Sequence, residues 1–487
     1  MRLAKVHWTR AGEFRNRSVE LARLERWWRS NEREPLSLYG RRRVGKSWLF
    51  RRFAHGKPAI LLVADQVARG MQLERLAAQL EPVLGVRPKL ETTADLLRVL
   101  LKLAKAQKIL IVLDEFPYLL GATQAERKRT LSSLQAVLEE ERDHSKAKLL
   151  LTGSTIATME ELQLERSPLH GRLVPFPLKP MKFSHARALM DTSDPLAQLT
   201  CYSIAGGMPR YLAALQGRPG ARSLLEAVKS QILDPYGPLF NEPRTMLSVE
   251  LREPTTYFSI LATLARNPQH TSDIADKLRL ESKELTGYLH TLEQLQLVSR
   301  HLPVGAKVAA RTTQWRCDDD FVRFWFRFVQ PHQAELEAGL DPAAVIKRWI
   351  VPHLSDHSAI TFERIVLEWM RARYTAAAPQ VGAWWGPALH ALRREQVRTT
   401  EEIDVVVLDG RKVLAVAEAK WTNAALSFDV LRDLSSYKLP ALQQAGYEVG
   451  DVEIVLASRS GFTREVTTAA KGNRRIRLVD AHDILSA

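Results

Sequence analysis

Cysteine and long apolar runs are the scarcest features of this sequence. Only Cys201 and Cys317 occur in its 487 residues, far apart and without the partners of a metal-ligand pattern. A disulfide framework needs paired cysteines and a zinc site needs clustered ligands, so neither is expected. The longest apolar runs, such as residues 59–64 and 109–113, stay below the roughly 18 residues that cross a membrane. The start of the chain has no apolar signal core, and we expect a cytoplasmic protein without a membrane partner.

Internal repeats and low-complexity tracts are also absent. A composition of 45% apolar and 26% charged residues is typical of a folded chain and excludes a disordered or collagen-like one. At roughly 100 to 200 residues per domain, the length predicts three or four domains. Acidic residues are fewer than basic ones, with Asp+Glu 55 against Lys+Arg 70, a net charge of +15. This surplus favours a phosphate-bearing partner; the alternative is a basic solvated surface that binds no polyanion.

The first third alternates short apolar runs with longer amphipathic stretches, which predicts a parallel sheet covered by helices. Four runs are predicted as strands: residues 36–39, 59–64, 108–113 and 148–152. A proline-rich passage at residues 175–180 interrupts this pattern. Residues 184–250 then have helical Leu/Ala spacing.

The region from Pro254 to Phe328 predicts three helices followed by a hairpin, the order of a winged helix-turn-helix. Its third helix offers Lys283, Tyr288 and His290, and the wing offers Lys307 and Arg311, to DNA phosphates and a groove. The alternative is that this unit serves only for packing.

A phosphate-binding signature follows the first predicted strand. Gly40-Arg-Arg-Arg43-Val44-Gly45-Lys46-Ser47 fits the pattern G-x-x-x-x-G-K-[ST] and opens a helix. The loop N–H groups and the helix N-terminus suit nucleotide phosphates, Lys46 neutralises their charge, and Ser47 offers a hydroxyl to Mg²⁺. The sequence therefore predicts an ATP and magnesium site.

Two adjacent acids, Asp114 and Glu115, end the third predicted strand. Asp114 is predicted to hold the Mg²⁺ shell, and Glu115 to polarise the attacking water. Ser154 ends a neighbouring strand and is predicted to contact the γ-phosphate. Farther on, Arg172 is a candidate arginine finger, acting in cis or from a neighbouring subunit. The alternative for Arg172 is a surface or structural ion pair.

A second constellation lies near the end of the chain. Glu418 and Lys420, two apart on a predicted strand, face the same side, and Asp404 stands on the preceding strand of a predicted hairpin. Two carboxylates and a lysine suit metal-assisted phosphodiester hydrolysis, with Glu363 of the preceding helix as a further ligand. The alternative is a hairpin with a solvated charged face. Because buried strands rarely carry unpaired charges, the hydrolytic interpretation is favoured.

The chain resembles the archaeal-type ATPases of the P-loop AAA+/STAND group that carry a C-terminal DUF234 domain. The supporting segments are Phe14-Arg-Asn-Arg17, Leu38 to Ser47, Leu113 to Tyr118, Ser167 to Arg172, Gly206 to Tyr211, Phe321 to Phe328, Val381 to Trp385, Glu402-Ile-Asp404 and Glu418-Ala-Lys-Trp421. The last pair is similar to the PD-(D/E)xK restriction-endonuclease core. The resemblance implies an ATP site at Gly45, Lys46, Ser47, Asp114 and Glu115, with Ser154 as a sensor and Arg172 as the finger.

Pattern and resemblance together predict a multidomain α/β protein. We expect a P-loop ATPase core with a parallel sheet at residues 1–180, a helical lid at 181–250, a winged helix at 251–330, a linker helix at 331–350 and a restriction-endonuclease-like domain at 351–487. ATP binding or hydrolysis is predicted to govern nucleic-acid cleavage, with DNA as the favoured partner and a homo-oligomer as one arrangement of the finger. The alternatives are a nucleotide-controlled regulatory switch and a DNA-binding regulator.

The basic surplus is uneven. The first fifty residues hold thirteen Lys/Arg and five Asp/Glu, so more than half of the net charge surrounds the phosphate-binding signature. Part of the surplus therefore serves ATP phosphates or an adjoining subunit, and the prediction of a DNA partner depends mainly on Asp404, Glu418 and Lys420.

Overall fold

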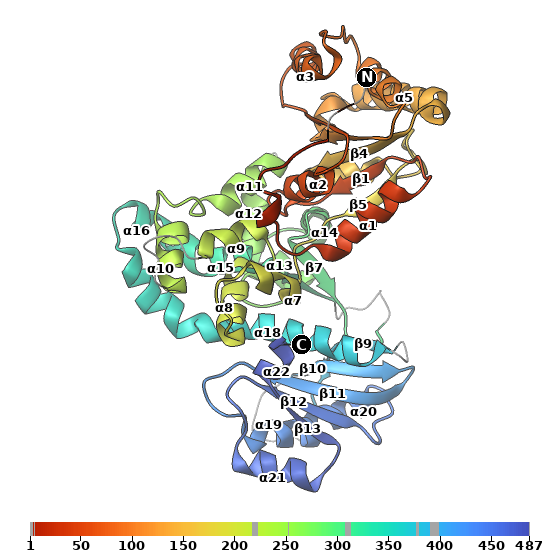
Figure 1. Cartoon of the computed structure of the whole chain (residues 1–487). Coiled ribbons are helices and arrows are strands. Elements are labelled where there is room, and N and C mark those ends of the chain that lie inside the picture. The colour runs from red at the N-terminus through yellow and green to blue at the C-terminus, as the bar shows by residue number, and fades with distance from the viewer. Residues whose placement is uncertain are drawn as a thin grey trace. The chain divides into compact units, whose positions relative to one another are not determined.

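The computed structural model describes residue 3 and residues 5–216, 223–251, 253–306, 313–375, 379–389 and 399–486. It divides into two units (Figure 1). Unit 1 comprises Met1–Pro180 and Met208–Arg210, and unit 2 comprises Met181–Gly207 and Tyr211–Ala487. The five domains expected from the sequence are a finer division than this one, and they stay a prediction.

Unit 1 is built on a parallel five-stranded sheet with the order β2-β3-β4-β1-β5. Its strands are β1 (Leu36–Tyr39), β2 (Ala59–Val63), β3 (Ile109–Asp114), β4 (Ala147–Gly153) and β5 (Val174–Pro177). Its main helices are α1 (Ser18–Arg29), α2 (Lys46–Ala54), α3 (Arg69–Leu84), α4 (Thr93–Leu103), α5 (Gln124–Glu141) and α6 (Ile156–Glu161). The central strands are buried on both faces, as their continuous apolar runs predict.

The fifth strand, β5, corrects the sequence analysis. The proline-rich passage was expected to end the sheet pattern, but Val174–Pro177 pairs in parallel with β1. Proline cannot donate to a ladder and is therefore confined to edge strands, which is where β5 lies. Because prolines are typical of loops, the sequence did not predict this strand, which pairs with β1 alone among the described strands.

Unit 2 begins with helices and continues into a three-helix unit, which we define as residues 255–317. The first helices are α7 (Phe183–Ala186), α8 (Pro195–Ala205), α9 (Pro209–Leu215), α10 (Leu224–Val228) and α11 (Glu242–Glu250). The three-helix unit contains α12 (Thr255–Leu264), α13 (Thr271–Leu278) and α14 (Ser282–Gln294), with strands β6 (Gln269–His270), β7 (Val298–His301) and β8 (Gln314–Cys317). This order agrees with a winged helix, although that assignment stays a prediction.

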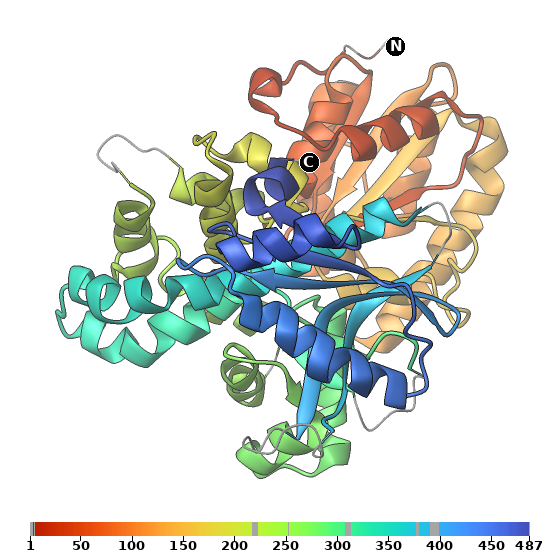
Figure 2. The same ribbon diagram turned by 90° about the horizontal axis from the view of Figure 1, so that it is seen from below.

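The last part of unit 2, which from the long helix α18 (Val351–Arg373) onward we call the C-terminal domain, holds a mixed sheet with the order β13-β12-β11-β10-β9. The strands are β9 (Gln380–Pro387), β10 (Thr400–Asp409), β11 (Lys412–Lys420), β12 (Glu453–Ser458) and β13 (Ile476–Asp480). The helices are α18 (Val351–Arg373), α19 (Phe428–Asp433), α20 (Leu439–Gln444), α21 (Arg464–Gly472) and α22 (Ala481–Ser486). Helix α18 lies against one face of the sheet and α19–α21 lie on the other (Figures 1 and 2). This domain is thus a separate α/β layer structure.

Between β8 and α18 run short helical segments, of which the first two are largely buried. They are α15 (Asp320–Phe324), η6 (Trp325–Val329), η7 (Gln330–His332), α16 (Gln333–Glu337), α17 (Pro342–Val345) and η8 (Ile346–Ile350). Trp325 is fully buried and its indole N–H donates to the Phe240 carbonyl at 2.6 Å. The aromatic residues of this stretch therefore form core.

The hairpin of the three-helix unit is packed against the C-terminal sheet. The Val304 N–H donates to the Ala383 carbonyl of β9 at 2.8 Å, and the Tyr447 hydroxyl donates to the Val304 carbonyl at 2.9 Å. Gly305 has φ +76, and a Cβ there would meet the Tyr447 hydroxyl at 2.5 Å. The turn at Gly305 thus packs against the C-terminal sheet, while a DNA-binding role of the three-helix unit stays a prediction. Lys307 and Arg311 lie outside the described residues.

A buried ionic cluster joins α8, α15 and α18. Asp320 accepts hydrogen bonds from Arg323 at 2.9 Å, from Thr361 at 2.9 Å and from Arg364 at 2.5 Å. Nearby, the buried His357 ring contacts the Ser203 carbonyl at 2.7 Å. These contacts link the first helices of unit 2 to the long helix of the C-terminal domain.

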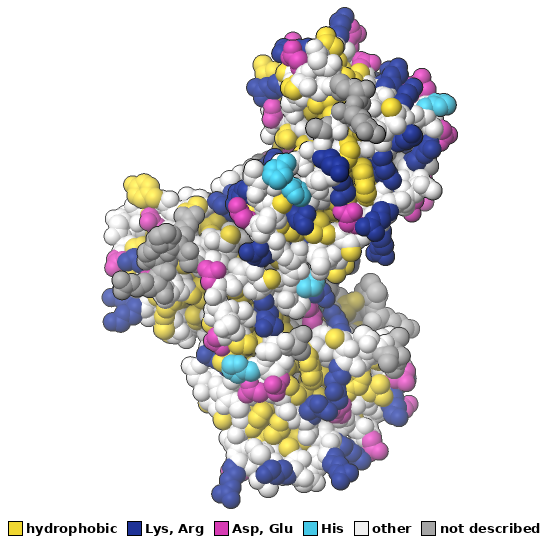
Figure 3. Space-filling model, in the orientation of Figure 1, with side chains coloured by type: hydrophobic (Ala, Val, Ile, Leu, Met, Phe, Trp, Pro, Cys, Tyr) yellow, Lys and Arg dark blue, Asp and Glu magenta, His cyan; other side chains and the backbone are white. Residues whose placement is uncertain are grey.

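The two cysteines are buried and no helix in the described ranges is long and apolar enough for a membrane span. Burial raises the pKa of Cys201 to about 11 and raises that of Cys317 further. On the face of unit 1 shown in Figure 3, Lys and Arg side chains gather over α1 and α2. This agrees with the basic character of the first fifty residues.

Candidate functional site

The predicted phosphate loop joins β1 to α2 in unit 1. Gly45 has φ +99 and immediately precedes α2, so the backbone turns into the helix in a conformation that favours glycine. The buried Lys46 ammonium donates to the carbonyls of Gly40 at 2.7 Å and Arg41 at 3.1 Å. Lys46 is thereby held within the loop whose phosphates it is predicted to neutralise.

Two further contacts fix the loop. A Cβ at Gly40 would lie 2.3 Å from the Leu178 carbonyl oxygen, so only glycine fits there. The buried Arg17 guanidinium donates to the carbonyl of Val44 at 3.1 Å and to that of Lys179 at 2.9 Å. Val44 is fully buried, whereas Arg43 is exposed with φ +68. Residues outside the phosphate loop thus hold its backbone in place. The sequence did not predict this role for Arg17.

Asp114 lies near Ser47 at the carboxyl end of the sheet. The Ser47 hydroxyl lies 3.4 Å from Asp114 Oδ2, and the Thr152 hydroxyl donates to Asp114 Oδ1. Burial raises the pKa of Asp114, and the neighbouring Glu115 carboxylate adds to the rise, against the lowering by Thr152 and Lys46. A hydroxyl and a carboxylate at this distance are hard oxygen donors that fit Mg²⁺.

Glu115 and Ser154 also lie together. Glu115 has φ +54, and its Oε2 accepts the Ser154 N–H at 3.1 Å and the Ser154 hydroxyl at 2.8 Å. Strand β4 lies between β1 and β3, so Ser154 follows the strand between the phosphate loop and the acids. In this structure Ser154 orients Glu115, while its predicted contact with the γ-phosphate stays a prediction.

Arg172 lies apart from this group. It precedes β5, whose first residue pairs with the first residue of β1, whereas the phosphate loop follows the last residue of β1. Arg172 is therefore at the amino end of the sheet, where it pairs with Glu139 of α5. An ion pair was one of the predicted alternatives, and the role of Arg172 as a finger stays a prediction.

In the C-terminal domain, Asp404, Glu418 and Lys420 converge. Between Ile403 and Val406 the register of β10 against β9 shifts, so Asp404 lies in a β-bulge, a feature that re-aims side chains. Asp404 Oδ2 accepts the Ala419 N–H at 2.8 Å and lies 3.6 Å from Lys420 Nζ. Lys420 also donates to Glu418 Oε2 at 3.0 Å. The polar face predicted from sequence is present.

Lys438, in the helical turn η10 (Leu434–Lys438), is a second cation of this site. Its ammonium donates to Glu418 Oε1 at 2.7 Å, and Glu418 itself is fully buried. Both Glu418 oxygens therefore pair with lysines. Burial lowers the pKa of Lys420, but the Asp404 and Glu418 carboxylates outweigh this effect and raise that pKa above its ordinary value.

Glu363 and Glu402 are the two remaining acidic residues of this site. Burial and the Asp404 charge raise the pKa of Glu363 to about 8, against the lowering by Arg316 of the three-helix unit and by Lys420. Burial likewise raises the pKa of Glu402, and Asp404 adds to the rise. We define these four acids, Glu363, Glu402, Asp404 and Glu418, as the acidic cluster.

The donor chemistry of the acidic cluster suits Mg²⁺, which prefers carboxylate oxygens. Within the part of the chain that the structure describes, however, no three His, Cys, Asp or Glu side chains form a group arranged to hold a metal ion. The two lysines take the Glu418 oxygens that a metal would use. Metal binding by Asp404, Glu418 and Glu363 therefore stays a prediction.

Sequence reasoning missed Glu402, Lys438 and Arg316. Glu402 stood in the predicted strand, and its i, i+2 spacing from Asp404 was the available signal. Lys438 and Arg316 come from segments distant in sequence, and nothing in the local pattern marks them.

The exposed side of α14 offers fewer groups than predicted. Lys283 and His290 are exposed, but Tyr288 is half-buried against Tyr257, with ring centroids 5.0 Å apart. His290 lies 3.8 Å from Glu293. This surface is therefore only weakly basic.

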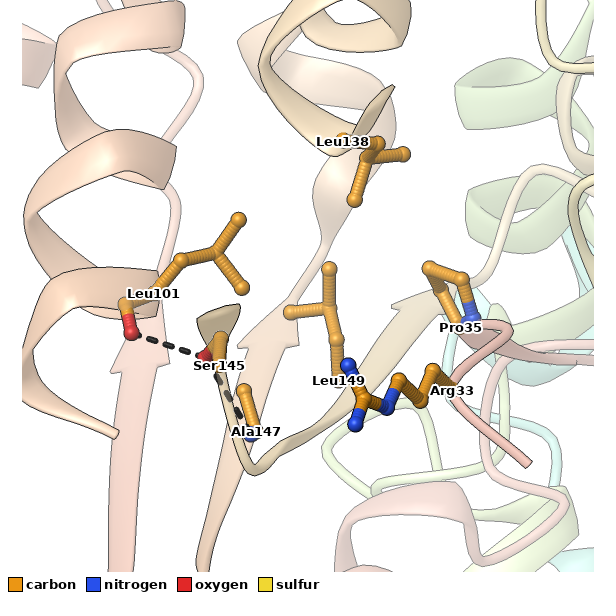
Figure 4. Close-up of a pocket in the computed structure, with 7 residues that line it drawn as sticks. All are labelled: Arg33, Pro35, Leu101, Leu138, Ser145, Ala147 and Leu149. Atoms are coloured by element: carbon orange, nitrogen blue, oxygen red, sulfur yellow. Dashed lines mark hydrogen bonds between the residues drawn. The ribbon is translucent and has the colours of Figure 1, made fainter. Parts of the chain in front are cut away.

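A small pocket lies at the amino ends of the unit 1 strands (Figure 4). Its lining residues are Arg33, Pro35, Leu101, Leu138, Ser145, Ala147 and Leu149. About 10 Å³ of it is open to water, which is room for about one molecule. The pocket lies at the opposite end of the strands from the phosphate loop and has no part in the candidate site.

Two families match parts of the chain. Residues 63–215 match the ATPase domain found predominantly in Archaea, and residues 325–433 match DUF234, described as archaeal and bacterial proteins of unknown function. The uncharacterized protein MJECL04 of Methanocaldococcus jannaschii is 27% identical over 419 residues, 84% of this chain and 88% of that protein. The uncharacterized ATP-binding protein MJ0423 of the same organism is 50% identical over 44 residues, 9% of this chain and 75% of that protein.

Two solved structures are similar to parts of the fold. The Walker-type ATPase PABY2304 of Pyrococcus abyssi superposes with a TM-score of 0.50 at 20% identity, covering 67% of this chain and 100% of that one. The ORC1 protein of Aeropyrum pernix, solved in complex with DNA, reaches a TM-score of 0.30 at 16% identity, covering 68% and 94%. Only the first likeness is close enough to support the fold.

A parallel sheet whose first strand ends in this phosphate loop defines a P-loop ATPase-like domain, here joined to a separate domain with a mixed sheet. The chain combines an archaeal-type ATPase domain with a C-terminal DUF234 domain.

Proposed function

We propose that unit 1 binds ATP at the phosphate loop and hydrolyses it. The observation that carries this proposal is the convergence of Lys46, Ser47 and Asp114 at the carboxyl end of the parallel sheet. The Ser47 hydroxyl is 3.4 Å from Asp114, and Glu115 and Ser154 lie beside them. These are the groups that phosphoryl transfer to water requires.

Each side chain has a distinct part in this reaction. The N–H groups of residues 43–47 bind the phosphates, and Lys46 exchanges its bonds to loop carbonyls for bonds to phosphate oxygens. Glu115 accepts a proton from the attacking water. At the same time the water oxygen bonds to the γ-phosphorus, and the bond from the γ-phosphorus to the bridging β–γ oxygen breaks. Ser154 keeps the Glu115 carboxylate oriented for that step.

Ser47 and Asp114 are the residues that would hold Mg²⁺. When bound, the ion supplies positive charge against the charge that develops on the phosphate oxygens. The raised pKa of Asp114 fits this role, because a nearby cation would favour its ionised form.

Variants of Lys46 and Glu115 test the proposal. We expect Lys46→Ala to lose ATP binding, and Glu115→Gln to keep binding while kcat falls by about 10² or more, as for loss of a general base. Glu165→Gln, at an exposed loop position of the same unit, is the matched control. ATP turnover unchanged in Glu115→Gln would remove Glu115 as the base.

Arg172 is proposed as a finger that acts in trans. Its place at the amino end of the sheet supports action on the nucleotide of a neighbouring subunit in a homo-oligomer. Mixing inactive Arg172→Ala and Lys46→Ala proteins should restore part of the ATPase activity, because one subunit keeps the phosphate loop and the other keeps the arginine. A mixture that stays inactive would contradict the proposal.

For the C-terminal domain we propose metal-dependent phosphodiester cleavage of nucleic acid, with DNA as the favoured substrate. The specific observation in its favour is the convergence of Asp404, Glu418, Lys420 and Glu363 around the bulge of β10. Carboxylates for a hard cation beside a lysine suit activation of water at a phosphodiester. Nucleotide state in unit 1 would then control this activity.

Cleavage of plasmid and single-stranded DNA with Mg²⁺ or Mn²⁺, with and without ATP, tests this second activity. We expect the pair Asp404→Ala/Lys420→Ala to abolish cleavage. The control pair Glu448→Ala/Lys412→Ala changes an exposed acid and an exposed lysine of the same domain. Cleavage that persists in the Asp404/Lys420 variant would show that the nuclease activity resides elsewhere.

A further inference from the structure

A cation from the three-helix unit lies at the acidic cluster of the C-terminal domain. Arg316 is in β8, and its Nη2 donates to the Ile360 carbonyl of α18 at 2.9 Å. Residues three apart on a helix share a face, so this bond brings the guanidinium to the side of α18 that carries Glu363. Its charge acts on both Glu363 and Glu402.

The position of Arg316 is fixed by the packed hairpin. Strand β8 pairs with both β6 and β7, and the turn that follows β7 is bonded to β9 through Val304 and Ala383 at 2.8 Å. Trp315, the residue before Arg316, is buried and donates to the Thr271 hydroxyl at 3.1 Å. Arg316 is therefore presented to α18 by a braced strand.

The charges of the site favour a third cation. The acidic cluster has four acids; Lys420 and Lys438 both pair with Glu418, and Lys420 also lies 3.6 Å from Asp404 Oδ2, so the two lysines face two of the four. A phosphodiester anion would be repelled by the carboxylates that remain. The charge of Arg316 acts on Glu363 and Glu402 together with that of Lys420, and among the described residues its buried Nε has no hydrogen-bond partner. A buried N–H without a partner costs free energy unless a ligand satisfies it.

We propose that Arg316 completes the C-terminal site, so that the three-helix unit and the C-terminal domain form one composite site for a nucleic-acid phosphodiester. Arg316 acts as a positioning residue: it offsets the carboxylate charge and lets the phosphate approach the acidic cluster. The proposal rests on the proposed nuclease function of this domain, and it assigns the three-helix unit a role in the site itself.

The test compares Arg316→Ala, Arg316→Gln and Arg316→Lys in the full-length protein. Glutamine keeps a donor for the Ile360 carbonyl without the charge, whereas lysine keeps the charge. Arg300→Ala, an exposed arginine on the neighbouring strand β7, is the control. Two readouts are measured: cleavage of single-stranded DNA with Mg²⁺, separated into kcat and KM, and its binding with Ca²⁺ in place of Mg²⁺. Thermal unfolding and ATP turnover report folding.

We expect Arg316→Ala and Arg316→Gln to weaken DNA binding about tenfold or more, as for loss of a hydrogen bond to a charged group, with KM rising more than kcat falls. Arg316→Lys should recover most of the binding, and Arg300→Ala should match the wild type. Equal binding by wild type and Arg316→Gln, or no recovery with lysine, would overturn the proposal. Because binding is measured without cleavage, a wild type that binds DNA but cuts none would refute the nuclease function while still deciding the role of Arg316.

Discussion

Gly40 illustrates how a single missing side chain shapes the phosphate loop. The Leu178 carbonyl oxygen occupies the space where a Cβ would stand, 2.3 Å away, and the Leu178 N–H donates to the Tyr39 carbonyl at 2.7 Å. The loop can therefore pass directly over the end of β5 only if residue 40 is glycine.

Gly40→Ala should therefore destabilise unit 1 and abolish ATP binding. Because the nearest atom is backbone and cannot swing aside, we expect a loss of roughly 1–3 kcal/mol in the free energy of unfolding, as for overpacking. Urea unfolding and titration with a fluorescent ATP analogue measure both effects. Gly12→Ala, where a Cβ meets nothing within 4 Å, should change neither.

Lys148 is a buried lysine at the start of β4. Its ammonium donates to the Glu32 carbonyl and to the Ser30 hydroxyl at 3.3 Å, and lies 5.1 Å from the Trp27 ring centroid. Burial, together with the charge of Lys108, lowers the pKa of Lys148 from 10.5 to about 8.

This lowered pKa predicts a pH dependence of stability. Between about pH 8 and pH 10.5 the unfolded chain binds the proton more tightly than the folded one, so stability should rise with pH across this window and be lowest below it. A rise of about 3 kcal/mol is expected, and Lys148→Met should remove it. Urea unfolding at several pH values measures the slope. Lys146→Met, at an exposed position, should keep the wild-type slope; an unchanged slope in Lys148→Met would refute the assignment.

At the scale of residues, the sequence predicted those site residues that lie close together along the chain. The loop from Gly40 to Ser47 and the pair Asp114 and Glu115 are contiguous, so pattern and chemistry coincide. Arg17, Lys438 and Arg316 reach their sites across 27, 20 and 44 residues, to Val44, Glu418 and Ile360. Only the folded chain brings such partners together.

The elements that the sequence predicted are those with continuous apolar runs. β1 has the predicted bounds, and β2, β3 and β4 differ from theirs by one residue at one or both ends. β5 was missed because its prolines resemble a loop, and β13 because its exposed edge carries Arg477. The bulge that re-aims Asp404 depends on pairing with β9, which local periodicity does not encode.

The packed turn after β7 gives a prediction for an element. Gly305→Val would place a branched side chain at φ +76 and against the Tyr447 hydroxyl, so the turn should leave the C-terminal sheet. We expect faster amide exchange in residues 298–306, with a loss of about 1–3 kcal/mol for the strained backbone. Hydrogen exchange followed by mass spectrometry measures this. Gly339→Val has φ +103 but open space around the Cβ, so it controls for backbone strain alone; equal exchange at 298–306 in both variants would contradict the packing.

At the scale of the whole chain, the buried cluster around Asp320 predicts that unit 2 unfolds as one block. Asp320 binds two arginines and a threonine from α15 and α18, so Asp320→Asn leaves buried positive charge unpaired. Breaking a buried pair in this way costs about 3–5 kcal/mol. Calorimetry should show the transition of unit 2 shifted as a whole, with that of unit 1 unchanged.

An exposed ion pair provides the comparison for this prediction. Arg432→Ala removes a surface partner of Asp429 in the same unit and should change stability by less than about 1 kcal/mol. A split transition in Asp320→Asn, with the C-terminal domain unaffected, would show that the cluster does not hold unit 2 together.

The two buried cysteines have a practical consequence. Thiol reagents attack the thiolate, and burial that raises the pKa of Cys201 to about 11, and that of Cys317 as well, leaves almost no thiolate at neutral pH. The natural chain is thus already a background for site-specific labelling. A cysteine introduced at an exposed position in each unit could carry a donor and an acceptor dye, and energy transfer between them would follow the response of the two units to ATP without removal of either native cysteine.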